Sequence, residues 1–313
     1  RKNLLTKNTF LILEVLGMKL LKITADGLPL FKEKLDICFY AQQRVSEDQK
    51  DILYSLFSNI YLNPANGFIG INASGKTSVL KVILLSLGIL NNEPINHIET
   101  KDILGNAQKA VLNIFFYSES KKEICRLETI ITSRQTKTEG IVYRILSENL
   151  WLKQADEVIT RKSLFDFDGK DPVMLRSGQE DFLSDDVSIM IARNKKTGEN
   201  MRVVNLLQFT NINVLPSSDN IPAEVITYLD PTVESLQFDE KDQKTIIRLK
   251  FKGKEEIVMN NPIQLNNYLS SGTVKGMITF TLAQEVLQKG GYIVVDEVEN
   301  HFNKEILTTL IRF

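Results

Sequence analysis

Hydrophobic residues along the chain follow two spacings, and each predicts a different kind of element. Helical spacing of apolar residues after an N-cap predicts the helix 46–61, and apolar content and length predict a buried helix over 78–87. The segments 201–215, 222–229 and 276–288 are also expected to be helical. Alternating or continuous apolar runs between turn residues predict the strands 19–25, 35–40, 111–117, 124–131 and 140–146. Three of these runs follow one another within 111–152, so this region is expected to form an antiparallel sheet, whereas 153–202 is polar and predicts an irregular or helical lobe.

Two further apolar runs lead directly into polar residues. Gly67-Phe-Ile69 is short and predicts the end of a strand just before a glycine-rich segment. Gly291-Tyr-Ile-Val-Val-Asp-Glu297 is continuously apolar until its two carboxylates. A run of this kind is typical of a central parallel strand that is buried on both faces.

The glycine-rich segment Gly70-Ile-Asn-Ala-Ser-Gly-Lys-Thr77 fits the pattern G-x-x-x-x-G-K-[ST], which predicts a loop that holds nucleotide phosphates. Such a loop binds anions through backbone N–H groups at the start of a helix. Lys76 would reach the β- and γ-phosphates of ATP, and the Thr77 hydroxyl would bind Mg²⁺. The residues predicted to contact the nucleotide here are Gly70, Asn72, Ala73, Ser74, Gly75, Lys76, Thr77 and Ser78.

The two carboxylates after the second apolar run complete this chemistry. Asp296 would hold Mg²⁺ through water, and Glu297 would lie beside the γ-phosphate and polarise the attacking water. A strand that simply ends in solvated acids is the alternative. With a phosphate-binding loop in the same chain, the functional interpretation is favoured.

A third segment, Tyr268-Leu-Ser-Ser-Gly-Thr-Val-Lys275, lies before the predicted helix 276–288 and one helix ahead of Asp296. The Ser270 hydroxyl and the Gly272 N–H at a helix start would form a second anion site. An ordinary helix N-cap in a Ser/Gly loop is the alternative for Ser270.

Together these segments resemble the ABC-type ATPase heads of the SMC/RecF/OLD group, and specifically the bacterial AAA-family ATP-binding proteins often found in phage-defence systems. Leu-Ser-Ser-Gly-Thr at 269–273 is similar to the family signature Leu-Ser-Gly-Gly-Gln. The resemblance covers 18–313 and includes Met18–Thr24, Leu229–Leu236, Lys244–Phe251 and Asp296–Phe302. It implies an α/β fold, an ABC-ATPase head with a phosphate-loop core sheet, an antiparallel β subdomain and a helical lobe.

The resemblance also implies a domain organisation and a function. Residues 1–17 would be a leader or extension; the core would comprise 18–100 and 262–313, with 101–261 inserted and the C-terminal end incomplete. The implied protein is an Mg-ATP-dependent ATPase that dimerises through its ATP sites, where Ser270 and Gly272 serve the partner's γ-phosphate. It would act as a switch for a nuclease or toxin effector. The alternatives are a DNA-repair or DNA-clamping ATPase of RecF/SMC type, and a non-hydrolysing ATP sensor that serves as a scaffold.

Several positions depart from the family pattern. Ser271 and Thr273 stand where the signature has Gly and Gln. Gln108 is a candidate for the Q-loop glutamine, with an exposed strand-edge glutamine as the alternative. His301 is displaced from the usual Leu-His pair and is interpreted as a helix-start residue rather than a catalytic one. The switch histidine is expected beyond Phe313.

The composition restricts the class of protein but does not indicate a specific function. The 313 residues, 43% hydrophobic and 25% charged, are ordinary for a folded globular protein. The net charge of −1 gives no overall attraction to nucleic acid. Cys38 and Cys125 fit no metal-binding spacing and are expected to be reduced structural thiols. No apolar run reaches about 18 residues, so no membrane association is expected, and an ATP-using chain is expected in the cytoplasm.

Overall fold

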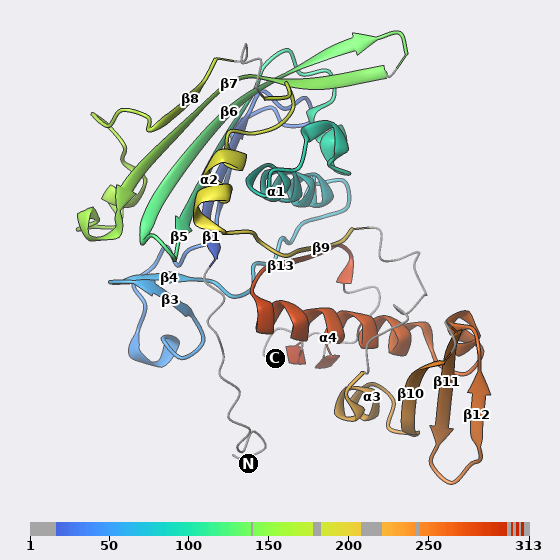
Figure 1. Cartoon of the computed structure of the whole chain (residues 1–313). Coiled ribbons are helices and arrows are strands. Elements are labelled where there is room, and N and C mark those ends of the chain that lie inside the picture. The colour runs from blue at the N-terminus through green and yellow to red at the C-terminus, as the bar shows by residue number, and fades with distance from the viewer. Residues whose placement is uncertain are drawn as a thin grey trace.

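The computed structural model describes residues 17–138, 140–177, 183–207, 221–241, 244–298, 302, 305–306 and 308–309. The fold is mixed α/β, with one large antiparallel sheet and several helices (Figure 1). Two smaller sheets and a β-hairpin complete it.

The large sheet has six strands in the order β2-β1-β5-β6-β7-β8, and every neighbouring pair is antiparallel. Its strands are β1 Met18–Asp26, β2 Leu35–Cys38, β5 Ala110–Ser118, β6 Glu123–Thr136, β7 Gly140–Gln154 and β8 Met174–Arg176. The antiparallel sheet expected within 111–152 is therefore confirmed. The two strands predicted near the N-terminus belong to the same sheet, which thus combines strands from both sides of residue 100.

Helix α1 (Lys76–Leu90) packs on one face of this sheet, and α2 (Met190–Thr197) lies beside it (Figure 1). From Leu80 onward the residues of α1 are buried almost all round except Lys81, in the same hydrophobic cluster as β1, β5, β6 and β7. The helix predicted over 78–87 is confirmed. Its burial on most sides agrees with its nearly continuous apolar sequence.

A two-stranded parallel sheet of β9 (Val203–Leu206) and β13 (Tyr292–Val295) lies between α1 and α4 (Figure 1). A parallel strand before Asp296 is confirmed, but among the described residues it is one of two strands rather than a central one. The expected burial of this strand on both faces is wrong, because only Val294 of its four residues is buried. The helix predicted over 201–215 is wrong at 203–206, where pairing with β13 selects a strand despite the helical spacing. The rest of that prediction falls on 208–220, outside the described residues.

The β-lobe is built from α3 (Ala223–Leu229), a three-stranded antiparallel sheet and the first part of α4 (Ser271–Lys289). The strands of this sheet are β10 Val233–Lys241, β11 Lys244–Phe251 and β12 Glu256–Met259. A Cβ atom added at Gly276 would lie 2.6 Å from Leu229, so this glycine allows the close approach of α3 and α4. The predicted helices 222–229 and 276–288 are confirmed.

Residues 46–61 do not form the predicted helix. Only Glu47–Gln49 is a turn of 3-10 helix, and the chain continues into the hairpin of β3 (Tyr54–Phe57) and β4 (Ile60–Leu62). Contacts between distant residues override the local pattern, because β4 bridges to Tyr40 beside β2 and packs on the large sheet. The strand predicted at 67–69 is also absent, and Ile69 is fully exposed.

Candidate functional site

The glycine-rich segment forms a loop that ends at the first residue of α1. Its backbone turns through positive φ angles at Ala73 (65°) and Gly75 (89°), conformations that glycine adopts at little cost. The Ser74 N–H donates to the Ile71 carbonyl at 3.2 Å. A Cβ atom at Gly70 would lie 2.5 Å from the Ser74 Oγ, so both glycines serve the tight path of this loop.

Lys76 folds back over the loop that precedes it. Its Nζ donates to the carbonyl oxygens of Gly70 and Ile71, at 2.9 and 3.1 Å. The N-cap of α1 is Gly75, which has no side chain to satisfy the free N–H groups of the first turn. An ammonium group and uncapped helix N–H groups are thus placed around one exposed loop, an arrangement that favours an anion.

Asp296 meets this loop from the end of β13. The Thr77 hydroxyl donates to the Asp296 Oδ2 at 2.5 Å, a contact between residues separated by 219 positions in sequence. The other carboxylate oxygen of Asp296 accepts from the Glu297 N–H at 3.0 Å. Glu297 has a φ of 50°, a sparsely populated conformation for a residue with a side chain, and its side chain is exposed. The fold therefore brings together Lys76, Thr77, Asp296 and the backbone of Glu297.

Strand β13 is held in place from its other end. The Tyr292 hydroxyl accepts the Leu20 N–H at 2.6 Å, at a point where the register of β1 shifts between Leu20 and Lys22. Burial raises the pKa of Tyr292 to about 12. The Gly291 backbone has a φ of 134°, and a Cβ there would lie 2.3 Å from the Arg202 carbonyl. These contacts determine where Asp296 stands relative to the phosphate loop.

We expect Tyr292→Phe to destabilise the chain by about 1–3 kcal/mol, because it leaves the buried Leu20 N–H without its acceptor. Urea unfolding followed by circular dichroism would measure the loss. Tyr54→Phe is the matched control, since its hydroxyl bonds to Glu119 in an exposed contact and should change the stability by less than about 0.5 kcal/mol. Equal effects of both substitutions would show that the Tyr292 contact does not position β13.

Ser270 is the N-cap of α4. Its Oγ accepts the Thr273 N–H at 3.0 Å and lies 2.8 Å from the Thr273 hydroxyl. Gly272 is in the first turn, and the flanking Leu269 and Val274 are buried in the β-lobe. Within the described residues, no hydrogen bond or ion pair joins Ser270 or Gly272 to the loop 70–78. One chain does not assemble all the predicted site residues in one place.

The other residues singled out in the sequence are Gln108, His301 and the two cysteines. Gln108 is exposed just before β5, and its carbonyl accepts from the Thr132 hydroxyl. His301 lies outside the described residues. Cys38 and Cys125 are both free thiols, and burial raises the pKa of the fully buried Cys125. Across the described part of the chain, no group of three or more His, Cys, Asp or Glu residues could hold a metal, and no helix is long and apolar enough to cross a membrane.

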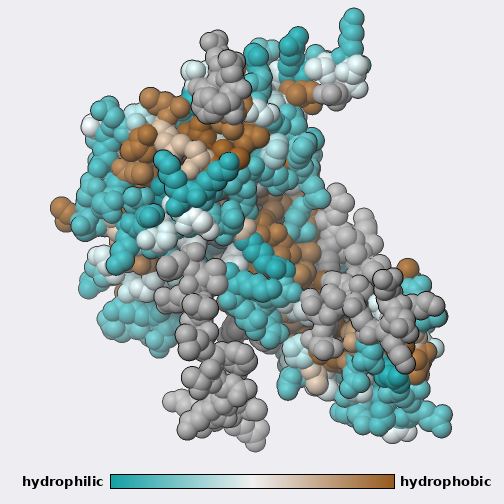
Figure 2. Space-filling model, in the orientation of Figure 1, coloured by the Kyte–Doolittle hydropathy of each residue, from teal (hydrophilic) through white to brown (hydrophobic). Residues whose placement is uncertain are grey.

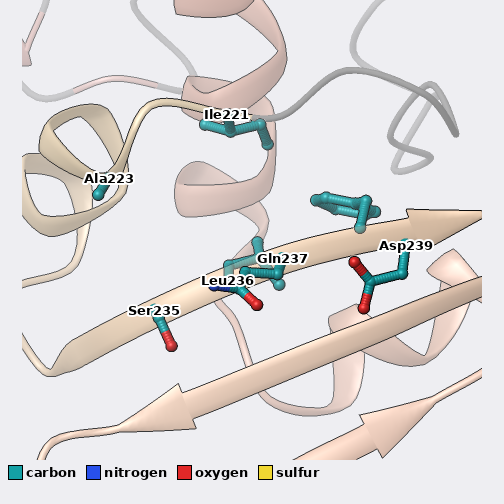
Figure 3. A pocket seen from close by; sticks show the side chains of 7 residues that line it. Ile221, Ala223, Ser235, Leu236, Gln237 and Asp239 are labelled. Atoms are coloured by element: carbon teal, nitrogen blue, oxygen red, sulfur yellow. The ribbon is translucent and has the colours of Figure 1, made fainter.

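Two cavities formed by described residues lie away from the phosphate loop. One, of about 440 Å³, is lined by the start of α3 and by β10 residues such as Ser235, Gln237 and Asp239 (Figure 3). The other, of about 350 Å³, lies around Cys38 and Tyr40. Neither includes a residue of 70–78 or the carboxylates after β13. The candidate site is therefore defined by the contacts of Lys76 with the loop carbonyls and of Thr77 with Asp296, rather than by a cavity.

No family model and no curated protein matches this chain. The function is therefore argued from the geometry of the phosphate loop and of the residues that contact it. Sequence reasoning missed two features that the fold reveals. One is the tether from Tyr292 to β1, and the other is an exposed group of cations on β6 and β7. Alternation of side chains along a recognised hairpin could have found the second.

Proposed function

We propose that this chain is an ABC-type ATPase that binds Mg-ATP and hydrolyses it. The hydrogen bond from Thr77 to Asp296 carries the proposal. It joins the segment that the sequence predicts to hold the phosphates to the carboxylate that it predicts to hold the metal. A glycine-rich loop that fits the pattern by chance would not be expected to contact a strand that ends in two carboxylates.

The residues present fit the nucleotide and the metal. Lys76 is already turned over the loop, where its carbonyl contacts can be exchanged for phosphate oxygens. The hydroxyl of Thr77 and the carboxylate of Asp296 are hard oxygen ligands of the kind that Mg²⁺ uses, in part through water. The bound metal would neutralise charge on the phosphates. The chain itself would supply the loop N–H groups and the Lys76 ammonium.

Glu297 is the proposed general base. It follows Asp296 directly, and its strained backbone carries the side chain away from β13 into solvent. Strain of this type is often retained where a side chain must be aimed for function. The carboxylate would accept a proton from the water that attacks the γ-phosphate. A scaffold that only senses ATP has no use for this group.

Dimerisation through the ATP sites is part of the proposal. The phosphate loop is exposed, with Ile71 84% accessible, and the Ser270–Gly272 turn lies in the β-lobe without a contact to its own loop. A second copy could place that turn on the open side of the loop. ATP would then join two heads and hydrolysis would release them, as expected for a cytoplasmic switch that controls a nuclease or toxin in phage defence.

The metal-dependent part of ATP binding tests the Thr77–Asp296 contact. We expect Thr77→Val and Asp296→Asn each to weaken ATP binding about tenfold in Mg²⁺ and to change it little in EDTA, because both groups act through the metal. The double variant should lose less than the sum of the two single effects, since the residues share one ligand. Isothermal titration calorimetry measures all three.

Thr227→Val is the matched control, because Thr227 is a half-buried helical threonine whose hydroxyl bonds, within the described residues, only to carbonyls of its own helix. It should bind ATP like the unmodified chain. Undetectable ATP binding by the unmodified chain in Mg²⁺ would overturn the proposal. Equal losses in Mg²⁺ and EDTA would show that Thr77 and Asp296 act on the fold rather than on the metal.

A further inference from the structure

The hairpin of β6 and β7 extends beyond the rest of the large sheet. β5 pairs with β6 only as far as Ile131, and β8 pairs with β7 only at 148–150. The strand pairing between β6 and β7 continues to Thr136 and Gly140. A two-stranded ribbon therefore projects from the sheet, as Figure 1 shows at its upper right.

One face of this ribbon is anchored to the body of the protein. Tyr143 is buried, its N–H donates to the Asn96 Oδ1 at 2.8 Å, and its hydroxyl donates to the Gly105 carbonyl at 3.0 Å. The Ser133 N–H and hydroxyl both donate to the Ala107 carbonyl. These contacts hold the ribbon in one orientation and leave its opposite face outward.

The outward face carries cations. Arg144 pairs across the ribbon with Thr132, and Arg134 pairs with Val142. Cross-strand partners share a face, so the two arginines are diagonal neighbours, about 7–8 Å apart at Cα. Lys137 lies at the turn, and Lys109 is beside the base of the ribbon, next to the Gln108 carbonyl that accepts from Thr132. We call these four residues the ribbon cations.

The ribbon cations are all exposed, and in the described parts of the chain none has an acidic side chain within 4.0 Å. Among the described residues, most other cations on strands are paired, as Arg126 is with Glu128 and Arg248 is with Asp239. Four unpaired cations on one anchored edge contrast with a chain whose net charge is −1. Figure 2 shows hydrophilic residues at the projecting tip.

We propose that this ribbon binds the phosphate backbone of duplex nucleic acid. The described polar groups on its outward face, at its turn and at its base are guanidinium, ammonium and threonine hydroxyl groups, the donors that contact phosphate oxygens. Among the described residues of the ribbon, Ile141 and Val142 are the only apolar side chains that are not buried, which is too few for the apolar core of a protein interface. Bases of a single strand need free aromatic faces, and on this face of the sheet the rings of Phe115 and Trp151 are covered by Arg126. This inference is independent of the proposed ATP site.

The test is fluorescence anisotropy of a labelled, random-sequence DNA duplex with the 313-residue chain, between about 50 and 200 mM salt. Four phosphate contacts predict a slope of about −3.6 for log K against log salt. Arg134→Gln/Arg144→Gln should bind at least about tenfold more weakly and lower the slope by about 2, one unit for each lost contact. Circular dichroism checks that the variant is folded.

Lys252→Gln/Lys254→Gln is the matched control, because it removes the same charge from another exposed hairpin turn. It should bind the duplex like the unmodified chain. No duplex binding at the lowest salt, or equal losses in the two double variants, would overturn the proposal. A labelled single strand that binds more tightly than the duplex would exclude duplex recognition, and displacement by polyglutamate at equal charge would point instead to an acidic protein.

Discussion

Lys76→Ala is expected to abolish measurable ATP binding while the chain stays folded. Lys76 holds its ammonium over the loop carbonyls and is the only cation of the segment 70–78. Its loss removes charge-assisted hydrogen bonds to the phosphates, so we expect a Kd at least about 100-fold higher, or about 2.7 kcal/mol. Isothermal titration calorimetry with ATP in Mg²⁺ gives the affinity.

The control for this substitution is on the same helix. Lys81 is little more than one turn further along α1 and forms a surface ion pair with Asp102. Lys81→Ala removes the same side chain and charge, yet it should leave the ATP affinity within about twofold and the stability within about 1 kcal/mol. If Lys76→Ala retains the affinity of the unmodified chain, with an unchanged circular dichroism spectrum, the phosphate-loop assignment is wrong.

Elements with a strong and uninterrupted pattern could be predicted from the sequence. The apolar content of α1 and the parallel strand β13 were visible as long runs, and their order along the chain suggested one site. What the sequence could not supply is the contact itself. The approach of Thr77 and Asp296 depends on the pairing of β13 with β9 and on the Tyr292 tether, both of which join distant residues.

The incorrect predictions have a common cause. The segments 46–61 and 201–207 have apolar residues at helical spacing, yet both contain strands because a partner elsewhere in the chain fixes their backbone. Local propensity is worth a few tenths of a kcal/mol per residue and is easily exceeded by such pairing. The ribbon cations were missed for a related reason. Net charge averages over the chain, whereas a β-hairpin places alternate residues of two strands on one face.

Glu297→Gln should abolish hydrolysis without preventing ATP binding. Glutamine has the same shape and still forms hydrogen bonds, but an amide is a far poorer base than a carboxylate. General base catalysis contributes about 10²- to 10⁴-fold, and we expect a loss of kcat in that range. Phosphate release measures the rate and calorimetry the affinity. A variant that hydrolyses ATP at the original rate would remove Glu297 from the proposed role.

The same variant tests whether the site is shared between two copies. If ATP joins the phosphate loop of one head to the Ser270–Gly272 turn of another, blocked hydrolysis should make the Glu297→Gln dimer accumulate. Light scattering should then report a doubled mass with Mg-ATP and the monomer mass without it. Ser270→Arg added to Glu297→Gln should restore the monomer, because a bulky cation cannot fit where a hydroxyl and an N–H must meet the γ-phosphate.

Ser270 also caps α4, so its replacement needs a control that separates the cap from the interface. Ser270→Ala removes the Oγ that accepts the Thr273 N–H and should cost about 0.5–2 kcal/mol of stability. It leaves space at the helix start, where the Gly272 N–H remains available, so in the Glu297→Gln background it should still dimerise with Mg-ATP, though more weakly. A dimer that persists in Ser270→Arg, or a Glu297→Gln mass that is the same with and without nucleotide, would exclude the shared site. The chain would then act on ATP, if at all, as a self-contained phosphate-loop enzyme.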